Sequence, residues 1–176
     1  FPGTDVVLGP EMKPTGEVMG IAGNFPAAFT KTQLAIDYEP PRGGEVFISV
    51  NDGDKRNITA IARSVARLGF SLVATTGTAR ALRASGIECE EVGKIHAGSH
   101  TILDRIASGE IVLMINTPFG SSTNTDGYEM RAACVRHGVS YCTTLAGAQA
   151  LIAGMEAVRE TGLDVIALQD LPQWEG

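Results

Sequence analysis

The chain of 176 residues has little of what marks membrane, nucleic-acid-binding or secreted proteins. No apolar run approaches the roughly 20 residues that a membrane-spanning helix needs, which argues against a membrane partner. A formal net charge of −6 argues against nucleic acid as the main partner, although a local basic pocket could still bind a small anion. The first residues, FPGTDVVLGP, have neither a basic nor an apolar signal region, so we expect no signal peptide.

Cysteine is also scarce. The chain has three cysteines, an odd number without the spacing of metal ligands, and they are Cys89, Cys134 and Cys142. Such residues are typical of free thiols in a reducing cytosol, which predicts a cytoplasmic protein without a metal site. Apolar residues, in contrast, make up 44% of the chain and charged residues 19%, which predicts a globular protein with a substantial core.

The sequence divides into four parts. Residues 1–38 are too few to bury a core of their own, and apart from a helical pattern over 25–36 they predict the tail of another domain. Prolines and glycines then mark a linker over residues 39–44. Strand and helix patterns alternate over residues 45–170, which predicts one α/β domain, and residues 171–176 are a C-terminal tail.

The clearest unit of this domain follows the linker. The run Val46–Val50 is typical of a strand buried on both faces, residues 58–68 have apolar side chains at helical spacing, and residues 70–74 predict a second strand. Asp54, in the turn between them, is expected to cap the helix. A strand, a helix and a strand within about thirty residues predict a parallel βαβ unit.

Similar patterns continue to the end of the domain. They predict helices over 78–84, 100–107, 127–137 and 143–158, and strands over 87–92, 111–115, 139–142 and 165–168. Asp126 is expected to cap the helix that starts at Gly127. The predicted fold is a Rossmann-like, doubly wound α/β domain, with a mostly parallel sheet of about five strands and helices on both faces.

Polar residues follow the first two strands of this sheet. Lys55 lies in the turn after the first strand, and Thr75 and Thr78 lie in the turn after the second. Ligands of open parallel sheets bind at the carboxyl ends of the strands. Hydroxyls, a glycine and free helix-terminal N–H groups suit a phosphate, and the lysine adds positive charge. The alternative is that the threonines only cap a helix and Lys55 is a solvated surface lysine.

Later strands end in polar residues too. Lys94 follows the third strand, Asn116 and Thr117 follow the fourth, and Tyr141 and Thr143 flank the end of the fifth. Taken singly, Lys94 could be a surface lysine, Asn116 a turn former and Thr143 a helix cap. Because a parallel sheet brings the carboxyl ends of its strands to one edge, we expect Lys55, Thr75, Thr78, Lys94 and Asn116 to lie together there.

A family resemblance rests on the stretches GDKRNITAIARSVARLGFSLVATTGTA, HAGSHTILDRIASGEIVLMINTPFG and YCTTL. They resemble the C-terminal allosteric domain of the carbamoyl-phosphate synthase large subunit, which has the methylglyoxal-synthase-like fold. The upstream stretch LGPEMKPTGEVMGIAGNFPAAFTKTQLA is similar to the end of the second ATP-grasp half of that subunit. The resemblance thus covers almost the whole chain and implies a C-terminal fragment of a much larger enzyme.

The resemblance implies that this domain binds nucleotide effectors, with uridine monophosphate (UMP) as inhibitor and inosine monophosphate (IMP) at an overlapping site. The residues that it assigns to the phosphate or the nucleotide are Lys55, Thr75, Thr78, Lys94, Asn116 and Thr117. Pro118 departs from the Asn-Thr-Thr pattern of the enterobacterial proteins, and this removes a hydroxyl and an N–H from the expected base and ribose contacts. The resemblance does not say which nucleotide is preferred.

The resemblance also implies partners beyond the nucleotide. It assigns Tyr141 and Thr143 to an ornithine site, whose acidic residues would lie upstream of Phe1. The rest of the large subunit and a glutaminase small subunit are expected partners, and a homo-oligomer is left open. The parent enzyme would be an ATP-dependent, glutamine-hydrolysing ligase of arginine and pyrimidine biosynthesis that uses Mg and K, whereas no cofactor is expected in the fragment.

The main alternative is an enzyme of the same fold, methylglyoxal synthase, which eliminates phosphate from dihydroxyacetone phosphate. That reaction needs a carboxylate base and a histidine, and alignment on the helix before GEI puts Ser99 and Asn124 in their places. Asp52 and Asp104 remain as carboxylates, but capping its turn is the simpler role for Asp52, and Asp104 is expected in the middle of a helix. His96 and His100 could act as acid or base, although histidines near a loop are more often only hydrogen-bonded. We therefore predict no catalytic residue. A plain oligomerisation module, the third alternative, would leave the lysines and the threonine turn without a role.

Overall fold

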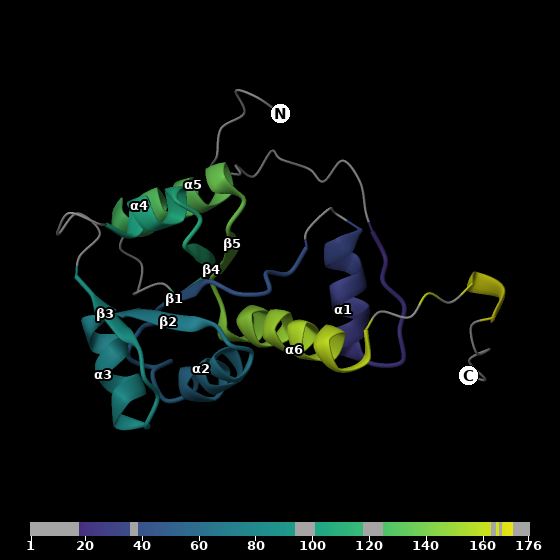
Figure 1. Ribbon diagram of the computed structural model, residues 1–176, viewed down its shortest axis with the longest axis horizontal. Coiled ribbons are helices and arrows are strands. Elements are labelled where there is room, and N and C mark those ends of the chain that lie inside the picture. The colour runs from purple at the N-terminus through teal and green to yellow at the C-terminus, as the bar shows by residue number, and fades with distance from the viewer. Residues whose placement is uncertain are drawn as a thin grey trace.

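The computed structural model describes residues 18–35, 39–93, 101–117, 125–162, 165 and 167–170 (Figure 1). Its helices are α1 (Phe25–Leu34), α2 (Ile58–Arg67), α3 (Thr76–Ala84), α4 (Ile102–Ala107), α5 (Thr125–His137), α6 (Leu145–Thr161) and the 3-10 helix η1 (Leu168–Asp170). Its strands are β1 (Glu45–Ser49), β2 (Ser71–Thr75), β3 (Glu90–Val92), β4 (Ile111–Asn116) and β5 (Ser140–Cys142).

The strands form one parallel sheet with the order β3-β2-β1-β4-β5, which confirms the predicted doubly wound fold. The chain builds the sheet outward from β1 through β2 to β3 and then returns to the other side of β1 with β4 and β5. The strand order therefore reverses between β1 and β4. In sheets of this kind the crevice outside the carboxyl ends of the strands at that point is the usual place for a ligand.

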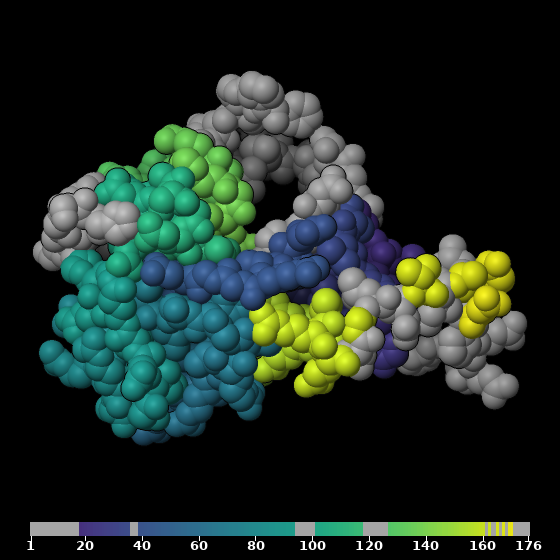
Figure 2. Space-filling view, in the orientation of Figure 1, coloured from purple at the N-terminus to yellow at the C-terminus, as the bar shows by residue number. Residues whose placement is uncertain are grey.

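Helices cover both faces of the sheet. Helices α2, α3 and α6 lie on one side of it and α4 and α5 on the other (Figure 1). Successive side chains of β1 point to opposite faces: Val46 and Ile48 pack with the α2 and α6 residues, whereas Phe47 packs with Ile106 and Met114. This two-sided burial explains why β1 has a continuous apolar run. In the space-filling view, the segment that enters β1 crosses the surface as a blue band between the two layers (Figure 2).

Helix α1 packs against α6. Thr30 of α1 is 2% exposed, and a Cβ atom added to Gly154 of α6 would lie only 2.3 Å from its Oγ1 atom. Glycine at this position therefore permits the close approach of the two helices. Residues 1–17 lie outside the described residues, so the predicted domain division at residues 39–44 stays a prediction.

One predicted strand and one predicted boundary are wrong. The described residues of the predicted strand 165–168, which are 165, 167 and 168, are not in a strand: Val165 is 99% exposed, and η1 begins at Leu168. The third strand begins at Glu90 and not at Ile87, because Ile87 buries its side chain in the loop before the strand.

The predicted caps also differ. The carboxylate of Asp54 accepts a hydrogen bond from the Asn51 side chain at 2.6 Å, so it does not cap α2; only the Asp54 carbonyl accepts from the N–H of Ile58. Asp126 lies inside α5, which begins one residue earlier. At the start of α6, Thr144 is the cap in place of Thr143, since its hydroxyl accepts from the N–H of Gly147 at 3.1 Å.

Of the described helices, none has the length and apolar character that crossing a membrane requires.

Candidate functional site

The carboxyl ends of β1, β2 and β4 and the residues that follow them lie side by side. We call this region the carboxyl rim; the described residues discussed there are Ser49, Asn51, Asp52, Lys55, Thr75, Thr78, Asn116 and Thr117. Its centre is a link between Asn51 and Thr117, which follow β1 and β4. The backbone N–H and the side-chain amide of Asn51 both donate to the Thr117 hydroxyl at 3.0 Å. Thr117 is 2% exposed, and its own N–H donates to the Ser49 carbonyl at 3.0 Å. Thr117 therefore holds the two strand ends together.

Three hydroxyls gather beside this link. The Thr75 hydroxyl lies 3.3 Å from those of Ser49 and Thr78, and Thr78, only 1% exposed, accepts from the N–H of Val50 at 3.2 Å. The structure thus brings the predicted residues Thr75 and Thr78 together at the carboxyl end of β1. It also adds Ser49, which sequence analysis missed; the available signal was a hydroxyl within an otherwise apolar strand.

Lys55 lies over the start of α3. A Cβ atom added to Gly77, in the first turn of α3, would lie 3.0 Å from the Lys55 ammonium nitrogen. The side chain is 29% exposed and pairs with the carboxylate of Asp52. Asp52 therefore forms an ion pair, in place of the capping role expected for it. Lys55 is held at the rim and is not a freely solvated surface lysine.

The first turn of α3 has no side-chain cap. Thr75 occupies the N-cap position, but its hydroxyl bonds to the other hydroxyls and not to a helix N–H. The interpretation of Thr75 as no more than a helix cap is therefore wrong. Free N–H groups and the helix dipole favour an anion at this place, and the Lys55 ammonium adds a formal positive charge.

Asn116 and Tyr141 meet at the ends of β4 and β5. The Asn116 amide donates to the Tyr141 hydroxyl at 2.6 Å, and the guanidinium carbon of Arg131 lies 5.3 Å from the centroid of the tyrosine ring. Asn116 is thus the last residue of its strand and not a simple turn former. Thr143 is exposed in the bend after β5. Lys94, His96, Ser99, His100, Pro118 and Asn124 lie outside the described residues.

The cysteines offer no nucleophile. Burial raises the pKa of the Cys134 thiol to about 12 and that of Cys142 to about 11, and the pKa of Cys89 is raised as well, mainly by burial. All three are free thiols. Because the thiolate is the reactive form, the raised pKa values lower the reactivity of these thiols at neutral pH.

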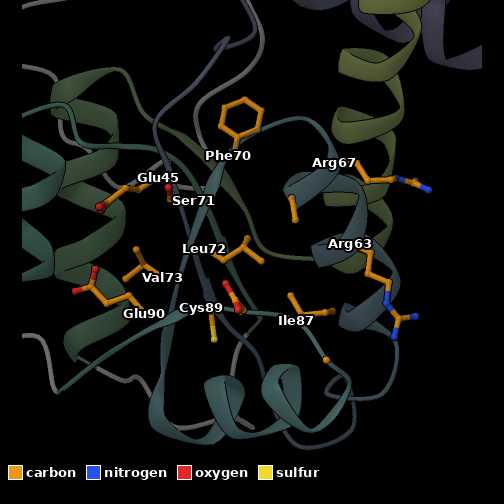
Figure 3. Close-up of a pocket in the computed structure, with 13 residues that line it drawn as sticks. Glu45, Arg63, Arg67, Phe70, Ser71, Leu72, Val73, Ile87, Cys89 and Glu90 are labelled. Atoms are coloured by element: carbon orange, nitrogen blue, oxygen red, sulfur yellow. The ribbon is translucent and has the colours of Figure 1, made fainter.

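A hollow of about 860 Å³ lies at the opposite edge of the sheet, where β1, β2 and β3 begin (Figure 3). Several of its charged groups have partners: Arg105 pairs with Glu45 at 3.1 Å and with Glu90, and Arg63 donates to the Ser85 carbonyl at 2.9 Å. Arg63 and Arg67 extend from α2 at one side of the lining residues in Figure 3. An anion in this hollow would meet the carboxylates of Glu45, Glu88 and Glu90, so the carboxyl rim is the better candidate for a phosphate site.

Comparison with known proteins identifies the relatives of this chain. Residues 57–143 match the family model described as MGS-like domain. The C-terminal section of the carbamoyl phosphate synthase large chain of Methanopyrus kandleri is 52% identical over 172 residues, which cover 97% of this chain and 32% of that protein. The carbamoyl phosphate synthase large chain of Myxococcus xanthus is 45% identical over 170 residues, which cover 97% of this chain and 16% of that protein.

Solved structures show the same fold. A methylglyoxal synthase from Elizabethkingia anophelis has a TM-score of 0.52 at 18% identity, with 64% of this chain and 78% of that chain covered. The structure of ForH also has a TM-score of 0.52, at 19% identity, with 68% and 82% covered. At such identities the likeness concerns the fold alone.

The similarity to the large chains extends over nearly the whole length of this chain, although the chain spans only 32% and 16% of the two relatives. The resemblance stated from the sequence is confirmed in this respect. The chain therefore belongs to the carbamoyl phosphate synthase large-chain family, of which it contains the MGS-like domain.

Proposed function

We propose that this chain is a regulatory part of a carbamoyl phosphate synthase large chain and that its carboxyl rim binds the phosphate of a nucleoside monophosphate such as UMP or IMP. The observation that supports this most is the position of the Lys55 ammonium over Gly77, at the uncapped start of α3. Thr75 and Thr78 place hydroxyls beside it. A phosphate monoester, with three acceptor oxygens and close to two negative charges, matches these donors.

The remaining predicted residues complete this proposal. Lys94 would add a second positive charge to the phosphate site, and Asn116 and Thr117 would face the ribose or the base. Tyr141 and Thr143 would contribute to an ornithine site together with residues of another part of the large chain. Regulation would follow from differential binding, because an effector shifts an equilibrium only by its difference in affinity for two states.

For the whole protein we propose the activity that the family resemblance implies. The parent would be an ATP-dependent, glutamine-hydrolysing ligase that works with a glutaminase subunit, Mg and K in cytoplasmic arginine and pyrimidine biosynthesis. This chain would contribute regulation to that enzyme and no catalytic group. The methylglyoxal synthase alternative has only the shared fold in its favour.

Calorimetric titration of the 176-residue chain tests the phosphate site. UMP and IMP should bind, whereas uridine and inosine, which lack the phosphate, should bind at least about tenfold more weakly, since charge-assisted hydrogen bonds contribute most of the affinity. Equal binding of uridine and UMP would show that the rim does not hold a phosphate.

A further inference from the structure

The Lys55 ammonium already has an anionic partner at the carboxyl rim. It forms an ion pair with Asp52, three residues earlier in the chain. The two side chains differ in burial: Lys55 is 29% exposed, whereas Asp52 is 84% exposed. The lysine is therefore the held member of the pair, packed over Gly77, and the carboxylate is the member that can move into solvent.

The turn that carries this pair is anchored to the sheet. The side chain of Asn51 accepts from the N–H of Asp54 at 3.1 Å and donates to the Asp54 carboxylate at 2.6 Å and to the Thr117 hydroxyl at 3.0 Å. Asp54 is thus engaged within the turn, so the carboxylate that faces Lys55 is that of Asp52. Because Asn51 ties this turn to Thr117, Asp52 and Lys55 leave the sheet from a fixed point and lie close to each other.

We propose that the Asp52 carboxylate competes with the bound anion for the Lys55 ammonium. This inference rests on the proposed function, since it concerns the affinity of the same phosphate site. The Asp52 carboxylate holds the Lys55 ammonium, and an incoming phosphate must displace it. Asp52 therefore sets the affinity of the site without being one of the groups that donate to the ligand.

Replacement of Asp52 by an anion at Lys55 also affects which anions bind tightly. A carboxylate or another singly charged anion would replace one negative charge at Lys55 by another, with little net gain. A phosphate monoester brings close to two charges and three acceptor oxygens, and it can bond the helix N–H groups as well as the ammonium. The cost of displacing Asp52 is the same for both kinds of anion, but only the phosphate monoester has enough further contacts to offset it.

The test substitutes Asp52→Asn, which removes the charge and keeps the shape. Titration of the 176-residue chain with UMP and with inorganic phosphate at low salt should show a roughly two- to fivefold tighter Kd, the range that an exposed ion pair supports. High salt should reduce this gain. Glu88→Gln removes the same charge from an exposed residue at the opposite edge of the sheet and should leave the Kd unchanged.

A second pair of variants separates competition from general repulsion. In a Lys55→Met background, Asp52→Asn should lose most of its effect, because the group for which the anions compete is gone. An equal gain in that background, or an unchanged or weaker Kd in Asp52→Asn itself, would overturn the inference. If UMP binding still depends on Lys55 and on the phosphate, the proposed function survives that result. Absence of phosphate-dependent binding in every variant would contradict both the inference about Asp52 and the proposed function.

Discussion

The side-chain amide of Asn116 donates to the hydroxyl of Tyr141 at 2.6 Å, so a residue proposed for the nucleotide contacts a residue proposed for ornithine. The two belong to the neighbouring parallel strands β4 and β5. Arg131 of α5 lies over the tyrosine ring and covers it from the helix layer. A ligand that moves either side chain therefore changes the surroundings of the other, which is the physical requirement for coupling between two sites.

Tyr141→Phe tests this link. Loss of the hydroxyl leaves the Asn116 amide without its partner, which should lower the free energy of unfolding by about 0.5–1.5 kcal/mol and weaken UMP binding severalfold. Denaturant unfolding and calorimetry measure the two effects. Thr143→Val, in the exposed bend after β5, is the control and should leave UMP binding unchanged. In the full-length large chain it should impair activation by ornithine. Wild-type UMP affinity in Tyr141→Phe would show that the link has no part in nucleotide binding.

Lys55→Met should weaken UMP binding by about 1.5–3 kcal/mol, because a charge-assisted hydrogen bond is lost from the phosphate site. Lys94→Ala should have an effect of similar size if Lys94 supplies the second charge. The matched control is Lys31→Met on α1, whose ammonium donates to the Ile21 carbonyl far from the rim in sequence and in fold. Calorimetry at low salt measures all three variants. Equal Kd values for Lys55→Met and Lys31→Met would contradict the proposed site.

Gly77→Ala separates ligand binding from stability. Its new Cβ would lie 3.0 Å from the Lys55 ammonium, so the lysine must move, and UMP binding should weaken by about 1 kcal/mol. Alanine favours the helical conformation, so the melting temperature should not fall. Gly147→Ala, in the first turn of α6, is a similar change away from Lys55 and should not alter the Kd. Tighter UMP binding in Gly77→Ala would mean that Lys55 lies elsewhere when the phosphate is bound.

The sequence predicts the sheet well because buried parallel strands leave a strong local signal. The apolar runs of β1 and β4 are unbroken since both faces of each strand are covered, and the residues after them fall at one edge by topology alone. A short apolar run is a weaker signal. Residues 165–168 have strand-like composition, yet the last residue of that run starts η1.

The side-chain partners at the rim could not be predicted, because they depend on contacts between residues distant in sequence. Asp54 fits the pattern of a helix cap, but its carboxylate is engaged by Asn51, which is itself positioned by Thr117 from β4. Ser49 was not predicted as a site residue, because it lies in an otherwise apolar strand. The pairing of Asp52 with Lys55 depends on the shape of the turn, and this shape is set by the same link to Thr117.

The charged cluster at the amino ends of the strands gives a prediction about pH. Burial raises the pKa of Glu45 above its ordinary value; the attraction of Arg105 opposes this shift, and repulsion from Glu90 and Glu110 adds to it. A carboxyl whose pKa is higher in the folded state contributes most to stability below its ordinary pKa, near 4.5, and this contribution is lost as the pH rises through the folded value.

Glu45→Gln should therefore change the unfolding free energy at pH 7 by less than about 1 kcal/mol in either direction, because loss of the ion pair is offset by relief of the burial of a charge. Arg105→Met, in contrast, leaves Glu45 and Glu90 without their shared cation and should destabilise the fold by about 3 kcal/mol. Urea unfolding between about pH 4 and pH 7 measures both, and the destabilisation in Arg105→Met should grow as the pH rises from 4 to 7, because the carboxyl of Glu45 then loses its proton without a cation beside it. A loss of several kcal/mol in Glu45→Gln at pH 7 would show that the ion pair outweighs the burial of its charges, contrary to the direction of the Glu45 shift.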